Sequence, residues 1–240
     1  MASTQVPRTR RGPAKKGSPA SESSILDFTK PQPVVTIIAG QGKFAQNFII
    51  HTALITHHSS YFKSAFGSSL AEGATQTMKL EDITSEAFGL VNQWLYFLEF
   101  PSSPSKASSL ENLVKVWMAA ERFRMPALQN YASGVLCERL VEPEVLLETV
   151  TAEHRRLADD RFDDYLACIK HIYFSTPAGE HKLKLLVLDI FPYHQLSYAD
   201  RIEEFPIAFC QDVVRRLAEK TRGSGSWPLN RTSRFLVGGT

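Results

Sequence analysis

The chain has 240 residues, 43% of them hydrophobic, and its 27 basic and 25 acidic residues leave a formal net charge of +2. That apolar content is enough for a packed core and excludes a chain that is disordered throughout. The charge is uneven, because residues 1–24 hold five basic and one acidic residue (+4), which leaves 22 basic and 24 acidic residues (−2) for positions 25–240. The composition of the folded part therefore excludes a basic surface of the size that nucleic acids require.

The cysteines and the first residues of the chain indicate a cellular compartment. Cys137, Cys168 and Cys210 are odd in number and far apart, so they predict neither a disulfide framework nor paired metal ligands, which fits a reducing compartment. Residues 1–24 lack the apolar segment of a signal peptide. No apolar stretch approaches the roughly 20 residues of a membrane helix. We therefore expect an intracellular protein, in the nucleus, the cytoplasm or both, with no membrane partner.

Both ends of the chain differ in composition from the middle. Residues 1–24 hold repeated prolines and glycines and few apolar side chains, which predicts a disordered basic tail. Three interpretations of this tail stay open: a solubilising segment, a nuclear import signal within residues 8–16, or a non-specific nucleic-acid contact. We expect no specific nucleic-acid partner. Residues 221–240 are predicted to be a Gly/Ser linker and a C-terminal tail, either loosely ordered or docked as a strap.

Three short segments have the pattern of strands. Residues 34–39 are a β-branched run that Gly40 and Gly42 close, and residues 44–50 follow as the second arm of a hairpin. Residues 76–80 alternate polar and apolar side chains, which is typical of a half-exposed strand. The sequence therefore predicts a small three-stranded sheet.

Helices dominate the chain after the third strand. Apolar residues recur at helical spacing from Phe88 to Leu98, and the next helix is predicted to open with a capping box of Ser108 and Glu111. Pro126 fits the first turn of a further helix, where its missing N–H costs nothing. The expected fold class of this part is α/β, a small sheet packed by a cluster of helices.

After residue 142 the periodic segments are all helical. The expected helices cover residues 145–150, 162–173 and 182–191, with a last helix that Pro206 opens. The inward face of this last helix is predicted to carry Phe209, Val213 and Leu217. The pattern therefore predicts an all-helical C-terminal extension over residues 143–220.

The order of these elements and several spaced motifs resemble the BTB/POZ family. The motifs, in chain order, are Ile50-His51-x-x-Leu54-Ile55-x-x-x-Ser59-x-Tyr61-Phe62-x-x-x-Phe66, Leu70-Ala71-Glu72, Leu80-Glu81-Asp82, Ala87-Phe88 to Trp94-Leu95-Tyr96, and Ala119 to Leu128. The resemblance spans residues 31–140 and is closest to short fungal members of the family. It implies a BTB/POZ domain over residues 25–142, in which Ser59 caps the helix that buries Phe62 and Phe66.

The resemblance also implies a function and a set of contact residues. BTB domains are protein-interaction modules, and those that recruit the cullin scaffold of ubiquitin ligases share a hydrophobic-x-Glu motif in the loop before the third strand. Leu70, Ala71 and Glu72 occupy that place here, and Phe123 matches a position near the cullin contact. For each, an alternative stays open: Leu70 folds back onto the domain, and Phe123 belongs to the core. We therefore expect protein partners, with a substrate adaptor for a cullin ubiquitin ligase as the most concrete form.

Two points of this interpretation are left open. Many family members have an Asp just before the first strand's Val/Ile run, where this chain has Val34, and that Asp is associated with the dimer interface in the family. Homodimerisation is therefore undecided. The alternative function is a nuclear scaffold or transcription-associated oligomerisation protein that binds no cullin.

The residues offer no candidate for catalysis or for a cofactor. Gly40-Gln41-Gly42 joins two strands of a hairpin and does not open a helix, as a dinucleotide motif would. The acidic run at residues 159–164 lacks the spacing of a calcium loop and is expected at a helix N-terminus. A zinc site of His51, His57 and His58 is disfavoured, because adjacent helical residues point about 100° apart; His51 is expected to be packed or hydrogen-bonded. We predict a non-enzymatic protein without metal or cofactor.

Overall fold

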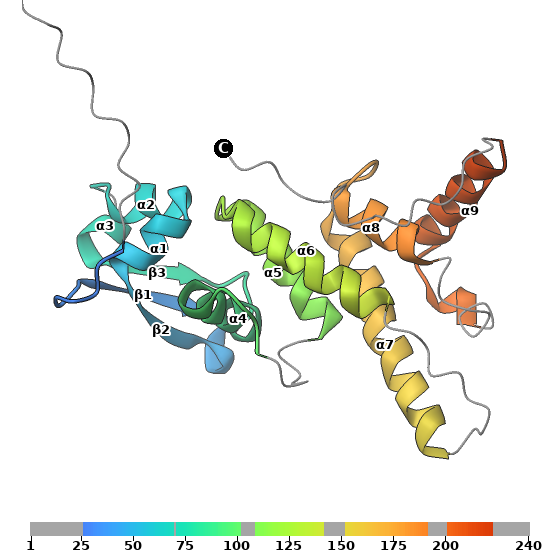
Figure 1. The fold of residues 1–240 in the computed structure, drawn as a ribbon, viewed down its shortest axis with the longest axis horizontal. Coiled ribbons are helices and arrows are strands. Elements are labelled where there is room, and N and C mark those ends of the chain that lie inside the picture. The colour runs from blue at the N-terminus through green and yellow to red at the C-terminus, as the bar shows by residue number, and fades with distance from the viewer. Residues whose placement is uncertain (1–25, 70, 102–108, 142–151, 192–200, 223–240) are drawn as a thin grey trace, which may run out of the picture.

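The computed structural model describes residues 26–69, 71–101, 109–141, 152–191 and 201–222 (Figure 1). Several expectations lie outside these residues. They concern the basic tail at 1–24, the helix at 145–150, and the C-terminal tail from residue 223 onward. The structural statements that follow concern the described residues.

The three expected strands form one mixed sheet. They are β1 (Val34–Ala39), β2 (Gln46–His51) and β3 (Thr77–Leu80), in the order β2-β1-β3. β1 pairs antiparallel with β2, from Val34 opposite His51 to Ala39 opposite Gln46, and parallel with β3. β2 begins two residues later than expected, because residues 42–44 form a 3₁₀ turn, η1 (Gly42–Phe44). Gly40 and Gly42 have φ of +96° and +54°, a conformation that glycine adopts without strain.

Six helices complete the part of the chain that resembles a BTB domain (Figure 1). They are α1 (Thr52–His58), α2 (Ser60–Phe66), α3 (Ala71–Thr75), α4 (Ser85–Phe97), α5 (Leu110–Arg122) and α6 (Pro126–Val141). The inward strand residues Val35, Ile37 and Ile50 are buried together with Phe88 of α4. Pro126 begins α6, as expected. The α/β class and the small sheet with its helical cluster are thus confirmed.

Serine side chains cap the N-termini of α2 and α5, and one of these caps differs from the expectation. Ser59 caps α2 by accepting from the Phe62 N–H at 3.1 Å, as expected. The cap of α5 is Ser109, which accepts from the Asn112 N–H at 3.2 Å, and the predicted Ser108 lies outside the described residues. Glu111 does not close a capping box but pairs with Lys115 at 2.7 Å, one turn along the helix.

Three helices form the C-terminal extension: α7 (Ala152–Ser175), α8 (Lys182–Ile190) and α9 (Ile207–Arg222). The helices predicted over 162–173 and 182–191 and after Pro206 are confirmed. Two details were wrong. The acidic run does not begin a helix, since α7 starts at Ala152, and Leu217 is 46% exposed and not on the inward face of α9.

The acidic run has a different structural role from the predicted one. Asp164 of α7 accepts from the Leu110 N–H, with its two oxygens at 3.0 and 3.1 Å, so it satisfies the first turn of α5 from a distant part of the chain. Arg201 lies beside Asp159 and Asp163 and stacks on the Phe162 ring. The run therefore joins the extension to α5 and to the segment before α9.

One hydrophobic core runs through the sheet, the helices α1, α2 and α4–α6, and the extension. Trp117 of α5 is fully buried, and its ring lies edge-on to His181, the residue before α8. In the described parts of the chain, no helix is long and apolar enough to cross a membrane.

Candidate protein-interaction surface

The predicted contact motif lies at the start of α3. Leu70 lies outside the described residues, and Ala71 and Glu72 are the first two residues of the helix. Ala71 is exposed and Glu72 is half-buried, so the carboxylate side of this turn reaches solvent. Ala71 and Glu72 are therefore accessible at the surface, at the start of a short helix.

Close backbone contacts hold α3 in place. A Cβ atom on Gly73 would lie only 1.8 Å from the Ser68 carbonyl oxygen, so only glycine permits this approach. Gln76, at φ +51°, donates from its side-chain amide to the Gly73 oxygen at 2.7 Å and the Phe66 oxygen at 3.3 Å. These contacts fasten α3 to the C-terminal end of α2.

Phe123 lies inside the domain and not on its surface. Its side chain is 0% exposed and packs against the rings of Phe62, Tyr61 and Phe88, with centroids 4.6, 5.5 and 6.5 Å away. The main-chain oxygen of Phe123 accepts from the Ser59 hydroxyl at 2.6 Å. Its side chain is therefore not available for direct contact with a partner. The buried ring instead packs between α2 and the α5–α6 turn and holds the turn in place.

Helix α2 connects the two predicted parts of the surface. Phe62 packs on Phe123 at one end, and Phe66, whose ring stacks on Phe62 at 6.1 Å, lies next to the α3 attachment at the other. The structure thus places Ala71 and Glu72 at one end of α2 and the turn around Phe123 at the opposite end.

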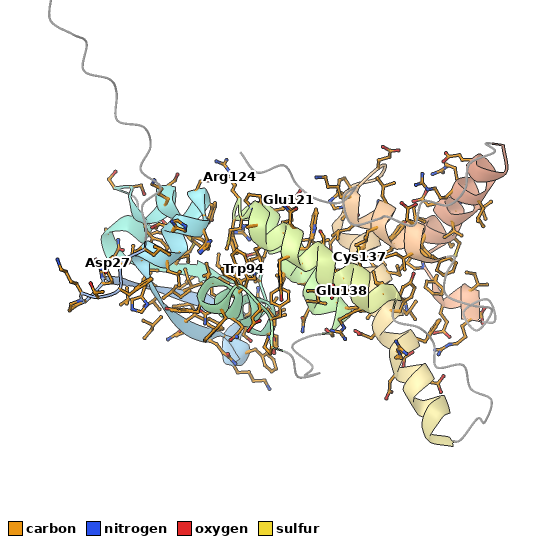
Figure 2. All side chains as sticks on the ribbon, viewed as in Figure 1. Asp27, Trp94, Glu121, Arg124, Cys137 and Glu138 are labelled. Carbon is orange, nitrogen blue, oxygen red and sulfur yellow. The ribbon has the colours of Figure 1, made fainter. Side chains whose placement is uncertain are left out.

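Two accessible residues near the α5–α6 turn were not among the contact residues predicted from the sequence. Tyr61 is partly exposed on α2, and Arg124 is exposed in the α5–α6 turn, where Figure 2 labels it together with Glu121. Tyr61 belongs to the signature motif and could have been found there. Arg124 has φ +53°, and no local sequence signal pointed to it.

Comparison with known proteins identifies the domain. The family model of the BTB/POZ domain matches residues 34–140, from the first residue of β1 to the last turn of α6. Residues 34–140 are a BTB/POZ domain. No curated protein matches the chain. BTB domains are in general protein–protein interaction modules and not enzymes, and they often dimerise.

The histidines of the BTB domain have structural contacts. His51 ends β2, and its Nδ1 lies 3.0 Å from the Tyr96 hydroxyl, which fits the expected hydrogen-bonded side chain. The His58 ring packs edge-on against Trp94, and burial, reinforced by neighbouring His57, lowers its pKa. Among the described residues no three His, Cys, Asp or Glu side chains gather as a metal site would require.

The extension lies beyond the BTB match and adds a surface of its own. Helix α7 packs on α5 and α8 packs on α6, so the extension rests on the two last helices of the BTB domain. On α9, Ile207 and Val214 are 77% and 66% exposed, although Phe209 of the same helix is fully buried. Burial raises the pKa of the Cys168 thiol on α7, so this cysteine is a core residue and not a reactive thiolate.

Proposed function

We propose that this protein is a substrate adaptor for a cullin-type ubiquitin ligase, in which Leu70, Ala71 and Glu72 are the recruiting residues. The observation that carries the proposal is the exposed start of α3, which a glycine contact and two amide hydrogen bonds fasten to α2. A motif held in this way loses little conformational entropy when a partner binds it.

Each residue has a distinct part in this contact. Leu70 inserts into an apolar pocket of the cullin, and the Glu72 carboxylate orients the two surfaces. Ala71 is small and allows close approach. Phe123 supports the contact without touching the partner, because its buried ring holds the α5–α6 turn beside α2.

The extension supplies the other half of an adaptor's task. An adaptor needs a second surface that binds the substrate while α3 is occupied. Ile207 and Val214 lie seven residues apart on α9, which places them on one side of the helix. We infer that this exposed apolar side contributes to substrate binding.

The test is a pull-down of the full chain with a purified cullin N-terminal domain. The double variant Leu70→Ala, Glu72→Ala should lose binding, and truncation of Leu70 alone should cost about 1–3 kcal/mol, as a central apolar contact does. Glu81→Ala is the matched control, since Glu81 is an equally ionisable, exposed residue after the opposite end of β3. Circular dichroism and thermal unfolding must show that the double variant stays folded.

The alternative class of function gives a different result in the same experiment. A scaffold that binds no cullin, with import directed by residues 8–16, predicts no capture of the wild-type chain at any concentration tested. Binding that is equally strong in the wild type and the double variant would also discard α3 as the recruiting surface.

A further inference from the structure

Helix α9, at the outer end of the extension, carries an exposed apolar stripe (Figure 1). Ile207 and Val214 are 77% and 66% exposed, and Leu217 is 46% exposed. Cys210 lies between them in the sequence and is half-buried. At about 100° per residue, these four positions span only about 80° around the helix axis. They therefore form one continuous line of side chains, which we call the α9 stripe.

The α9 stripe continues past the start of the helix and ends at a cluster of carboxylates. The Cys210 thiol lies 3.8 Å from the main-chain oxygen of Ile202, whose side chain is 40% exposed. The neighbouring Arg201 guanidinium lies 3.6, 3.3 and 2.6 Å from the carboxylates of Asp159, Asp163 and Glu204. Three negative charges around one positive charge leave this end of the stripe with a net charge of −2.

The sequence that follows α9 complements the stripe in composition and charge. Residues 223–226 contain only glycine and serine. Residues 227–237 begin with Trp227 and end with the apolar run 235–237, and the residues between are mainly polar. This segment holds two arginines and no Asp or Glu, so its charge of +2 is opposite in sign to that of the carboxylate cluster.

We propose that residues 227–237 dock as a strap along the α9 stripe, antiparallel to the helix. In this arrangement the Trp227 end covers Leu217, and the Phe235 end covers Ile207. Arg234 then lies beside the carboxylate cluster around Arg201. The docked strap removes the exposed apolar side chains of α9 from water and brings opposite charges together at one end.

The chain has the length that this arrangement needs. Ile207 and Leu217 lie about 15 Å apart along the helix axis. Residues 223–226 can carry the chain back by up to about 13 Å, and an extended chain from Trp227 to Phe235 spans up to about 27 Å. A short flexible linker also holds the strap near α9 at an effective concentration in the millimolar range, so weak contacts are enough to dock it. A separate protein has no such advantage.

The docking of the strap does not rest on the proposed function, but its consequence does. A docked strap occupies the side of α9 to which we assigned substrate binding. A substrate must therefore displace the strap, which makes the C-terminal segment an internal competitor for that surface.

The first experiment uses Cys210 as a reporter within the stripe. Iodoacetamide alkylation of the full chain, followed by peptide mass spectrometry, gives the rate at which each cysteine reacts. In the double variant Trp227→Ser, Phe235→Ser, the Cys210 rate should rise by about tenfold or more, because the strap no longer covers the stripe for most of the time. Equal Cys210 rates in the wild type and this variant would overturn the proposal and leave the stripe open to a different partner.

Three controls belong to this experiment. Cys137 is also half-buried but lies on α6, so its rate should be the same in every protein. Cys168 is fully buried and should stay unmodified, which shows that the core is folded. The double variant Asn230→Ser, Thr232→Ser changes only polar residues of the strap and should react like the wild type. Cys137 that accelerates together with Cys210 would mean a general loosening and would remove the support for a strap.

A second experiment tests the position of the strap. In a full chain whose Cys137 and Cys210 are replaced by serine, Ile207→Cys and Phe235→Cys together should form a disulfide within one chain when dilute protein is treated with oxidised glutathione. Ala208→Cys with Phe235→Cys is the matched control, because Ala208 is exposed but points about 100° away from Ile207.

The control pair should oxidise much more slowly than the pair at Ile207. Equal rates would show that the strap has no fixed position, and a disulfide that joins only separate chains would place the strap on another molecule. Either result would overturn the proposal. Neither experiment contains a cullin or a substrate, so failure of the proposed function would leave both outcomes unchanged.

Discussion

Ser59 uses one hydroxyl group for two buried hydrogen bonds. It accepts from the Phe62 N–H at the start of α2 and donates to the Phe123 oxygen at the α5–α6 turn, 64 residues away. The first bond caps a helix, and the second satisfies a carbonyl group that is buried with the core. One side chain thus fixes the relative position of α2 and the turn, on which the proposed partner surface depends.

Replacement of Ser59 by alanine removes only one oxygen atom, but it should lower the stability of the protein considerably. The change removes a helix cap and leaves the Phe123 carbonyl without its partner, so we expect the free energy of unfolding to fall by about 2–4 kcal/mol. Urea denaturation followed by circular dichroism measures the difference. Ser60→Ala, one residue along and exposed, is the control and should change stability by less than about 0.5 kcal/mol. A Ser59 variant as stable as that control would contradict this account.

Phe123 and Leu70 should give opposite results when stability and binding are measured together. Phe123→Ala empties a fully buried ring site and should lower the free energy of unfolding by about 3–5 kcal/mol. Where the variant is still folded, its affinity for the cullin domain should fall less than that of Leu70→Ala, because the ring supports the α5–α6 turn without reaching the surface. Leu70→Ala should weaken binding and leave the unfolding midpoint unchanged. If folded Phe123→Ala protein loses binding as strongly as Leu70→Ala, Phe123 is a direct contact.

At the scale of the elements, the sequence predicted which helices and strands exist better than how they end. Alternation and helical spacing depend only on neighbouring residues, and they located β1, β2, β3 and the helices from α4 onward. The positive φ angles of Gln76, Leu98 and Arg124 have no such signal, because none of them is the glycine that this conformation favours. The same limit applies to the cap that Asp164 provides for α5, since a contact over 54 residues leaves no local pattern.

The proposed partner surface stays a prediction, and the sequence located only part of its structure. The resemblance placed the Leu70–Glu72 motif before β3, and the structure shows Ala71 and Glu72 beginning an accessible helix. Whether the adjacent aromatic residue pointed inward or outward depended on the packing of α2 against the α5–α6 turn, so Phe123 could not be assigned from its position alone.

The cap of α8 makes this element sensitive to pH. His181 accepts from the Leu183 N–H through Nδ1 at 3.3 Å, which requires a neutral ring. Burial lowers the pKa of His181 from its ordinary value of 6.5, Glu121 opposes the shift and Lys184 adds to it. The unfolded chain therefore takes up a proton at a higher pH than the folded chain. The stability contributed by His181 is complete above pH 6.5 and is lost as the pH falls through that value towards the lowered pKa.

His181→Asn tests this pH dependence, because asparagine caps a helix without titrating in this range. The free energy of unfolding should decrease less for the variant than for the wild type when the pH is lowered from 7.5 to 5.5. Urea denaturation at several pH values gives the two curves, and their difference removes the contribution of other groups, including His58 and His171, whose pKa values burial also lowers. Parallel curves would show that His181 does not contribute.

At the scale of the whole molecule, the BTB domain and the extension share their core. Cys168, Ile169 and Ile172 of α7 are all fully buried, as is Val187 of α8, and they belong to the same cluster as the buried residues of β1. Across the same boundary, Asp164 adds a hydrogen bond to α5, and the His181 ring packs edge-on against Trp117 of α5. The domain boundary between residues 25–142 and 143–220 stays a prediction from the sequence. The packing indicates that the two parts stabilise each other.

A cavity in α7 should therefore destabilise the sheet as well as the extension. Ile169→Ala removes fully buried atoms of α7 from the shared core, and we expect the free energy of unfolding to fall by about 2–5 kcal/mol. If the molecule unfolds as one unit, hydrogen exchange should show that the slowest amides of β1 lose protection by the same free energy as those of α7. Lys170→Ala, the exposed neighbour, should leave both sets unchanged. If the β1 amides keep their wild-type protection while the α7 amides lose theirs, the two parts unfold separately. In that case a cavity in α7 does not change the stability of the sheet.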